Sequence, residues 1–144
     1  MVLIIMMLII RLEFMKKNIE HRSDIEYLVQ QFYQKIQKDN VLGPVFNQRI
    51  QVHEWDTHIQ KLTDFWETQL FSIPKFKGNP TQKHLETDAQ FNYQIKENHF
   101  KRWLSIWQET IDTHYQGDLA IRAKMGAVNI AKIQQNIILR NKPI

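Results

Sequence analysis

Glycine and proline are scarce in this chain, and their positions limit how it can fold. The sequence contains four of each among 144 residues, and most of the prolines fall between segments whose apolar residues recur every three or four positions. Because that spacing places apolar side chains on one face of a helix, the sequence predicts helices joined by short loops. Strand-type alternation is hard to find, and the length suits one domain with one core. We therefore expect a compact all-α domain.

Four amphipathic helices are expected. Ser23 is a suitable N-cap for the first, and Gly43-Pro44 ends it. Gly117 and Asp118 separate the third helix from the fourth, as a stop and a cap. The inner face of the first helix contains Ile25, Leu28, Val29, Phe32 and Ile36, and that of the second contains Trp55, His58, Leu62 and Phe65, widened by Ile59, Trp66 and Leu70. The third helix carries Phe100, Trp103, Leu104, Trp107 and Ile111, and the fourth carries Ala123, Ala127, Ile130 and Ile137.

Composition and missing motifs exclude several classes of function. No cysteine is present, which excludes disulfides, thiolate nucleophiles, iron–sulfur clusters and sulfur-based zinc sites. The net charge of +4 is spread along the chain, and Lys16-Lys17 is its one basic run, so we expect no nucleic-acid binding. The sequence contains no G-x-S-x-G, P-loop, G-x-G-x-x-G or H-E-x-x-H motif, which argues against hydrolase, nucleotide-binding and zinc-protease functions.

The opening segment MVLIIMMLII differs sharply from the rest of the chain. It is too short to span a bilayer, which takes about 20 apolar residues, and it lacks the basic region and cleavage site of a signal peptide. Met15 is followed by an ordinary polar segment. We expect an extension over residues 1–14 and a domain over residues 15–144. The extension is interpreted either as a mis-assigned start or as an anchor, and membrane contact is expected only through it.

Two histidines have unusual neighbours in the sequence. His84 lies in a polar stretch after a Gly/Pro-rich loop, whereas His58 faces inward among tryptophans and aliphatic residues. Alone, each has an ordinary interpretation, as do Tyr33 at the inner edge of its helix and Trp103 in an apolar stripe. Together they suggest a cavity with one axial metal ligand outside the stripes and three hydrogen-bond donors inside. These residues would under-coordinate a bare ion, whereas haem iron needs one protein ligand and an apolar slot.

Four segments in order resemble the group III truncated haemoglobins. They are FYQKIQKDNVLGPVFN (residues 32–47), WDTHIQKLTDFW (residues 55–66), GNPTQKH (residues 78–84) and HFKRWLSIW (residues 99–107). The resemblance covers residues 24–135. It implies a truncated globin, a two-over-two helical sandwich enclosing haem b, with the first globin helix largely lost and the proximal helix reduced to a short segment.

The resemblance also implies roles around the haem. His84 matches the proximal histidine that ligates the iron, and Phe46 matches the phenylalanine that packs on the haem face. Leu62 matches an apolar residue one turn beyond the distal position. Lys83 either approaches a haem propionate or is simply solvated.

On the distal side, Tyr33 matches the distal tyrosine, His58 the residue at the pocket entrance and Trp103 the tryptophan that points into the pocket. The implied function is binding of oxygen, nitric oxide and carbon monoxide, with slow oxygen release, in the cytoplasm. The alternative is nitric-oxide dioxygenase or peroxidase-like activity with an external reductase. A haem-free helical interaction module is the third interpretation.

Overall fold

The computed structural model describes residues 1–13 and 15–143, and nearly all of its regular structure is helical. The α-helices are α1 (Val2–Glu13), α2 (Arg22–Lys38), α3 (Gly43–Arg49), α4 (Trp55–Phe71), α5 (Pro80–Gln90), α6 (Glu97–His114) and α7 (Asp118–Arg140), and a 3-10 turn, η1 (Val52–Glu54), precedes α4. The predicted all-α class is confirmed.

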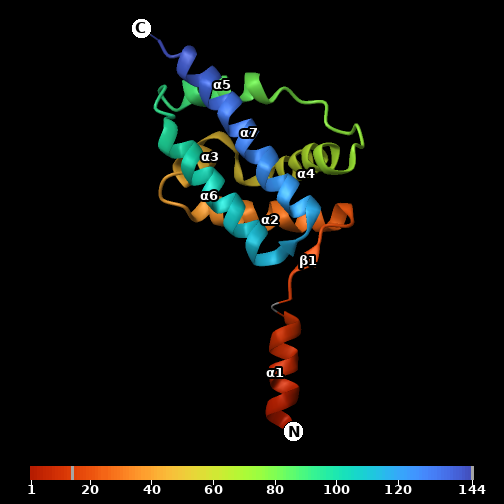
Figure 1. Ribbon diagram of the computed structural model, residues 1–144. Coiled ribbons are helices and arrows are strands. Elements are labelled where there is room, and N and C mark those ends of the chain that lie inside the picture. The colour runs from red at the N-terminus through yellow and green to blue at the C-terminus, as the bar shows by residue number, and fades with distance from the viewer. Residues whose placement is uncertain (14, 144) are drawn as a thin grey trace.

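Two helix pairs form the body of the molecule. α2 packs against α4, α6 packs against α7, and α2 also crosses α6, while α5 lies beside the far end of α7 (Figure 1). Trp107 of α6 joins the two pairs, because its ring stacks on Trp66 of α4 at 4.7 Å between centroids. Its indole N–H donates to the Ala123 carbonyl of α7 at 3.1 Å. The aromatic core therefore also fixes how α6 sits on α7.

Small residues along α7 permit close packing. Ala123 and Ala127 are completely buried, as predicted, and Ala120 and Ala131 extend the same row. Because alanine adds only a methyl group to the helix surface, the neighbouring backbones approach closely along this row. Ile130 and Ile137 lie half-buried at its edge.

A two-residue parallel bridge, which the sequence does not reveal, closes the base of the domain. β1 (Lys17–Asn18) pairs with β2 (Tyr115–Gln116). Gly117 follows with φ of 91°, in the region that favours glycine. An added Cβ there would lie 2.8 Å from the Asn18 side-chain oxygen. The bridge therefore ties the segment before α2 to the turn between α6 and α7.

The predicted helix ends need two corrections. Ser23 is not the cap of α2, because the helix begins one residue earlier and the Asp24 carboxylate accepts the backbone N–H groups of Glu20 and His21 at 2.9 and 3.0 Å. Gly43-Pro44 does not end the first helix, because α2 already ends at Lys38 and Gly43-Pro44 begins α3. Proline is well suited to a first helical turn, where its missing N–H would have no helical partner.

The extension behaves differently from the rest of the chain. Figure 1 shows α1 running away from the helical body, and the side chains of residues 1–9 are exposed. Within the described residues, no helix combines the length and apolar character needed to cross a membrane. The predicted boundary at residue 14 lies outside the described residues.

Candidate functional site

α4 carries one broad apolar face whose residues differ in burial. Trp66 and Leu70 are buried, whereas Trp55, His58, Leu62 and Phe65 of the predicted stripe are half-buried. Trp55, Leu62 and Phe65 pack against the core cluster, as predicted for the inner face. A half-buried row of aromatic and aliphatic side chains leaves apolar surface available to a bound group.

Tyr33 and His58 meet across the space between α2 and α4. Their ring centroids are 5.2 Å apart in an edge-to-face arrangement. Trp55 contacts both rings at 5.6 Å, and Phe46 of α3 contacts Tyr33 at 5.7 Å. Helical spacing positions His58 one turn after Trp55, so one face of α4 supplies both. The structure thus brings three of the predicted site residues, Tyr33, His58 and Phe46, into one aromatic cluster.

The polar atoms of this cluster are uncharged at neutral pH. Burial raises the pKa of the Tyr33 phenol well above its usual value, and the Trp103 side chain opposes that shift. Burial, assisted by the charge of Lys61, lowers the pKa of His58 to about 4. In the described part of the chain, the buried Nε2 of His58 has no hydrogen-bond partner. The cluster therefore offers a phenol O–H and a neutral imidazole whose Nε2 has no partner among the described residues.

Trp103 reaches the same cluster from α6. Its indole lies edge-on to Phe32 at 5.6 Å and stacks parallel to Trp107 at a centroid distance of 6.2 Å. Phe32 in turn lies 4.9 Å from the Tyr33 ring. Trp103 is half-buried, so its indole is held on two sides by the core while part of its surface stays open.

His84 lies on a separate element, α5. This helix begins at Pro80, and the Asn79 side chain caps it by accepting the Gln82 N–H at 3.0 Å. The loop of residues 72–79 therefore leads directly into an 11-residue helix, longer than the short helix or turn expected. Leu85, next to His84, packs in a cluster that includes Phe46, which connects α5 to the aromatic side of the site.

The imidazole of His84 is half-buried and neutral. Burial lowers its pKa, whereas the Gln134 side chain and the Pro80 carbonyl act in the opposite direction. Its buried Nδ1 makes no hydrogen bond to any described residue. A neutral imidazole is the form that coordinates metals.

The two remaining predicted residues differ in position. Leu62 lies on the half-buried face of α4, one turn beyond His58. Lys83 is exposed, and its ammonium lies 3.8 Å from the Glu86 carboxylate. The contacts of Lys83 therefore do not join it to the aromatic cluster.

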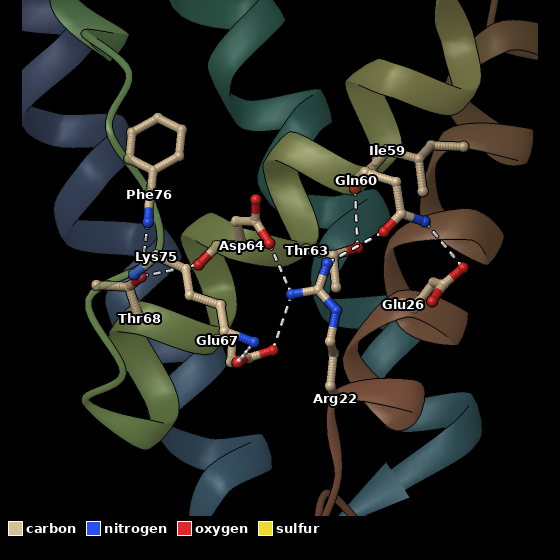
Figure 2. Close-up of polar contacts among 10 residues, drawn as sticks. All are labelled: Arg22, Glu26, Ile59, Gln60, Thr63, Asp64, Glu67, Thr68, Lys75 and Phe76. Atoms are coloured by element: carbon tan, nitrogen blue, oxygen red, sulfur yellow. Dashed lines mark hydrogen bonds and ion pairs between the residues drawn. The ribbon is translucent and has the colours of Figure 1, made fainter.

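A polar network that sequence reasoning missed holds the loop before α5 (Figure 2). Glu67 of α4 is only 2% exposed. Its two carboxylate oxygens meet the Lys75 ammonium at 2.8 Å and the Arg22 guanidinium at 2.9 Å. These contacts, the one from Lys75 foremost, lower the pKa of Glu67 against the opposing effect of burial.

The same loop is also held through its backbone. The N–H groups of Lys75 and Phe76 both donate to the Thr68 hydroxyl at 3.2 Å, and the Phe76 ring packs edge-on against Phe65 at 5.1 Å. Asp64 and Glu67 are two of several polar residues of α4, among them Asp56 and Lys61, so no local feature of the sequence singled out this network.

The residues present fit a haem group. His84 supplies a half-buried neutral imidazole, and the half-buried faces of α4 and α6 supply apolar walls. Tyr33 and His58 supply polar atoms that a small ligand can contact. Across the described residues, no three His, Cys, Asp or Glu side chains gather as a metal site. Single imidazoles suit a metal that brings its own equatorial ligands.

Comparisons with known proteins support this fit. The chain matches no family model. It is 29% identical over 128 residues to the group 3 truncated hemoglobin ctb of Campylobacter jejuni, which spans 88% of this chain and 97% of that protein. The crystal structure of a group III truncated hemoglobin from the same organism superposes with a TM-score of 0.78 at 28% identity, covering 90% of this chain and 100% of the other.

Proposed function

The chain is a globin homologous to the group III truncated haemoglobins, and on that premise we propose that it binds haem b through His84 and takes up oxygen and other diatomic ligands beside Tyr33. The observation that carries this proposal is the half-buried, neutral imidazole of His84 on a helix whose Leu85 packs in the same apolar cluster as Phe46. When bound, haem supplies an iron atom with an open position for a diatomic ligand.

The distal residues suit a ligand that carries partial negative charge. The Tyr33 phenol and the Trp103 indole are donors, and His58 donates or accepts according to its tautomer. Each neutral hydrogen bond is worth about 1 kcal/mol net, and more when the acceptor is charged. We therefore expect slow release of oxygen, and a smaller stabilising effect of these donors on bound nitric oxide and carbon monoxide. Phe46 and Leu62 provide apolar contact, and Lys83 either approaches a propionate or stays solvated beside Glu86.

A second candidate function is turnover of nitric oxide or peroxide. The free Nε2 of His58 favours it, since a neutral imidazole nitrogen beside a ligand can accept or pass on a proton. Such activity requires electrons, so we propose an external cytoplasmic reductase as their source. Mixing the oxygenated protein with nitric oxide, with and without candidate reductases, separates this function from simple reversible binding.

The experiment that tests haem ligation replaces His84 with alanine. We expect the wild-type protein to show a Soret band with one haem per chain, and the variant to lose it because the axial ligand is gone. Added imidazole should restore haem binding in the variant. His53→Ala is the matched control, because His53 is 82% exposed and lies outside the site. A variant that keeps a normal ferrous spectrum without imidazole would show that His84 is not the ligand.

A further inference from the structure

Lys142 lies just beyond the end of α7, and its ammonium is surrounded by oxygen atoms. It lies 2.7 Å from the Asp88 carboxylate and 2.8 Å from the carbonyl oxygens of both Tyr93 and Ile95. An ammonium has three N–H groups to donate, so this side chain is fully satisfied. Lys142 is 24% exposed and the Asp88 side chain 3%. The three oxygen atoms thus form a small cation-binding site that the Lys142 ammonium occupies.

Asp88 links this site to the proximal histidine. It lies four residues after His84 on α5, so the two side chains share one side of the helix. The same carboxylate oxygen that meets Lys142 also accepts the Ile95 N–H at 3.1 Å. A buried carboxylate without a cation is strongly unfavourable. The position of Asp88, and with it the last turn of α5, therefore depends on Lys142.

The turn after α5 carries backbone strain at the same place. Asn92 and Tyr93 are consecutive non-glycine residues with φ of 55° and 57°, in the left-handed region. Such conformations persist only where the surroundings enforce them. Here the Tyr93 N–H donates to the Asp88 carbonyl at 2.7 Å, and the Tyr93 carbonyl accepts from Lys142. The lysine thus stabilises the strained turn as well as the helix end.

Most other ion pairs among the described residues are more exposed. Lys101 and Glu97, for example, are 73% and 62% exposed, and exposed pairs contribute little. Lys142 instead joins three segments, α5, the strained turn and the end of α7, through a buried carboxylate and two backbone carbonyls.

We propose that Lys142 is a positioning residue for His84: its ammonium fixes the end of α5 and thereby the orientation of the imidazole toward the haem. This inference rests on the proposed function, in which His84 ligates the iron. The other end of α5 is set by the Asn79 cap, so the helix is fastened on both sides of the histidine.

The test compares Lys142→Met with Lys132→Met, which removes an exposed lysine from α7. In the haem-loaded protein, resonance Raman reports the iron–histidine stretching band, and transfer to apomyoglobin reports haem loss. For Lys142→Met we expect a shifted or broadened band and haem loss about tenfold faster, because hydrogen bonds to a charged group are lost. Lys132→Met should match the wild type in both measurements.

Two further measurements separate positioning from general stability. Amide hydrogen exchange should accelerate in residues 80–95 of Lys142→Met more than in α2 or α6. Lys142→Ala leaves the carboxylate and carbonyl oxygens that surrounded the ammonium without their cation. In this variant, methylammonium chloride should restore the iron–histidine band, whereas sodium chloride at equal ionic strength should not.

The inference is overturned if Lys142→Met has the band and haem-loss rate of Lys132→Met, or if exchange accelerates uniformly along the chain. Failure of methylammonium to restore the band in folded Lys142→Ala also overturns it. A wild-type protein that takes up no haem would instead overturn the proposed function.

Discussion

At the scale of a single residue, removal of the Tyr33 hydroxyl tests the proposed distal pocket. Tyr33→Phe keeps the ring and its contacts with His58 and Trp55 while deleting one donor. We expect oxygen to dissociate about five- to tenfold faster, because roughly 1 kcal/mol or more is lost with a hydrogen bond to a partly charged ligand. Stopped-flow release rates measure the effect directly.

Carbon monoxide and a neighbouring tyrosine provide the controls. Carbon monoxide is nearly apolar when bound, so its release should change less than that of oxygen. Tyr27→Phe alters the same helix at a position that is 43% exposed and should leave both rates unchanged. Equal effects on the two gases, or no effect on oxygen, would reduce Tyr33 to a core tyrosine.

The aromatic cluster of Tyr33 and His58 was easier to predict than the long-range contacts that hold α5 and the loop before it. Tyr33 and His58 follow helical spacing and the family resemblance, and the structure brings them together. The pairs Arg22–Glu67 and Lys142–Asp88 join positions 45 and 54 residues apart. No local pattern encodes such a pair, because each charged residue alone resembles an ordinary solvated one.

At the scale of elements, α4 shows why burial was harder to predict than helix formation. Its predicted extent agrees with the structure, since periodicity and loop residues define a helix. The predicted stripe does pack against the core, but Trp66 is buried while Phe65 beside it is only half-buried, because nothing local distinguishes full burial from partial burial of two aromatic residues. The buried part of the helix also includes Glu67.

Glu67 also provides the test at this scale. Replacing Glu67 with glutamine leaves Arg22 and Lys75 without their shared carboxylate. We expect the free energy of unfolding to fall by about 1–3 kcal/mol at neutral pH, as for hydrogen bonds to charged groups. Urea unfolding followed by tryptophan fluorescence measures it. Glu109→Gln, whose side chain is 65% exposed, should change stability little.

The contribution of Glu67 to the free energy of unfolding should depend on pH in a definite direction. Folding lowers the pKa of Glu67 below its ordinary value of 4.5, so the unfolded chain binds the proton more readily. The stabilisation is therefore present above 4.5 and is lost as the pH falls through the folded pKa. The difference between the wild type and Glu67→Gln should shrink in acid, and a constant difference would contradict the ion-pair assignment.

For the whole molecule, the separate position of α1 predicts that the globin body does not need it. We propose that residues 1–14 form an extension and residues 15–144 the domain. A chain that starts at Met15 keeps β1 and every later helix. We therefore expect its haem content and melting temperature to stay nearly unchanged, as absorbance and thermal unfolding would show. Loss of haem on truncation would mean that the extension belongs to the fold.

The bridge between β1 and β2 also determines the order in which this fold can be completed. Lys17 pairs with Tyr115, so the pairing encloses most of the domain, whereas α6 and α7 are neighbours along the chain. Closing a long loop costs more chain entropy than closing a short one, and local contacts form sooner. During synthesis the first segment of the globin body must therefore wait, unpaired, until residue 115 has left the ribosome.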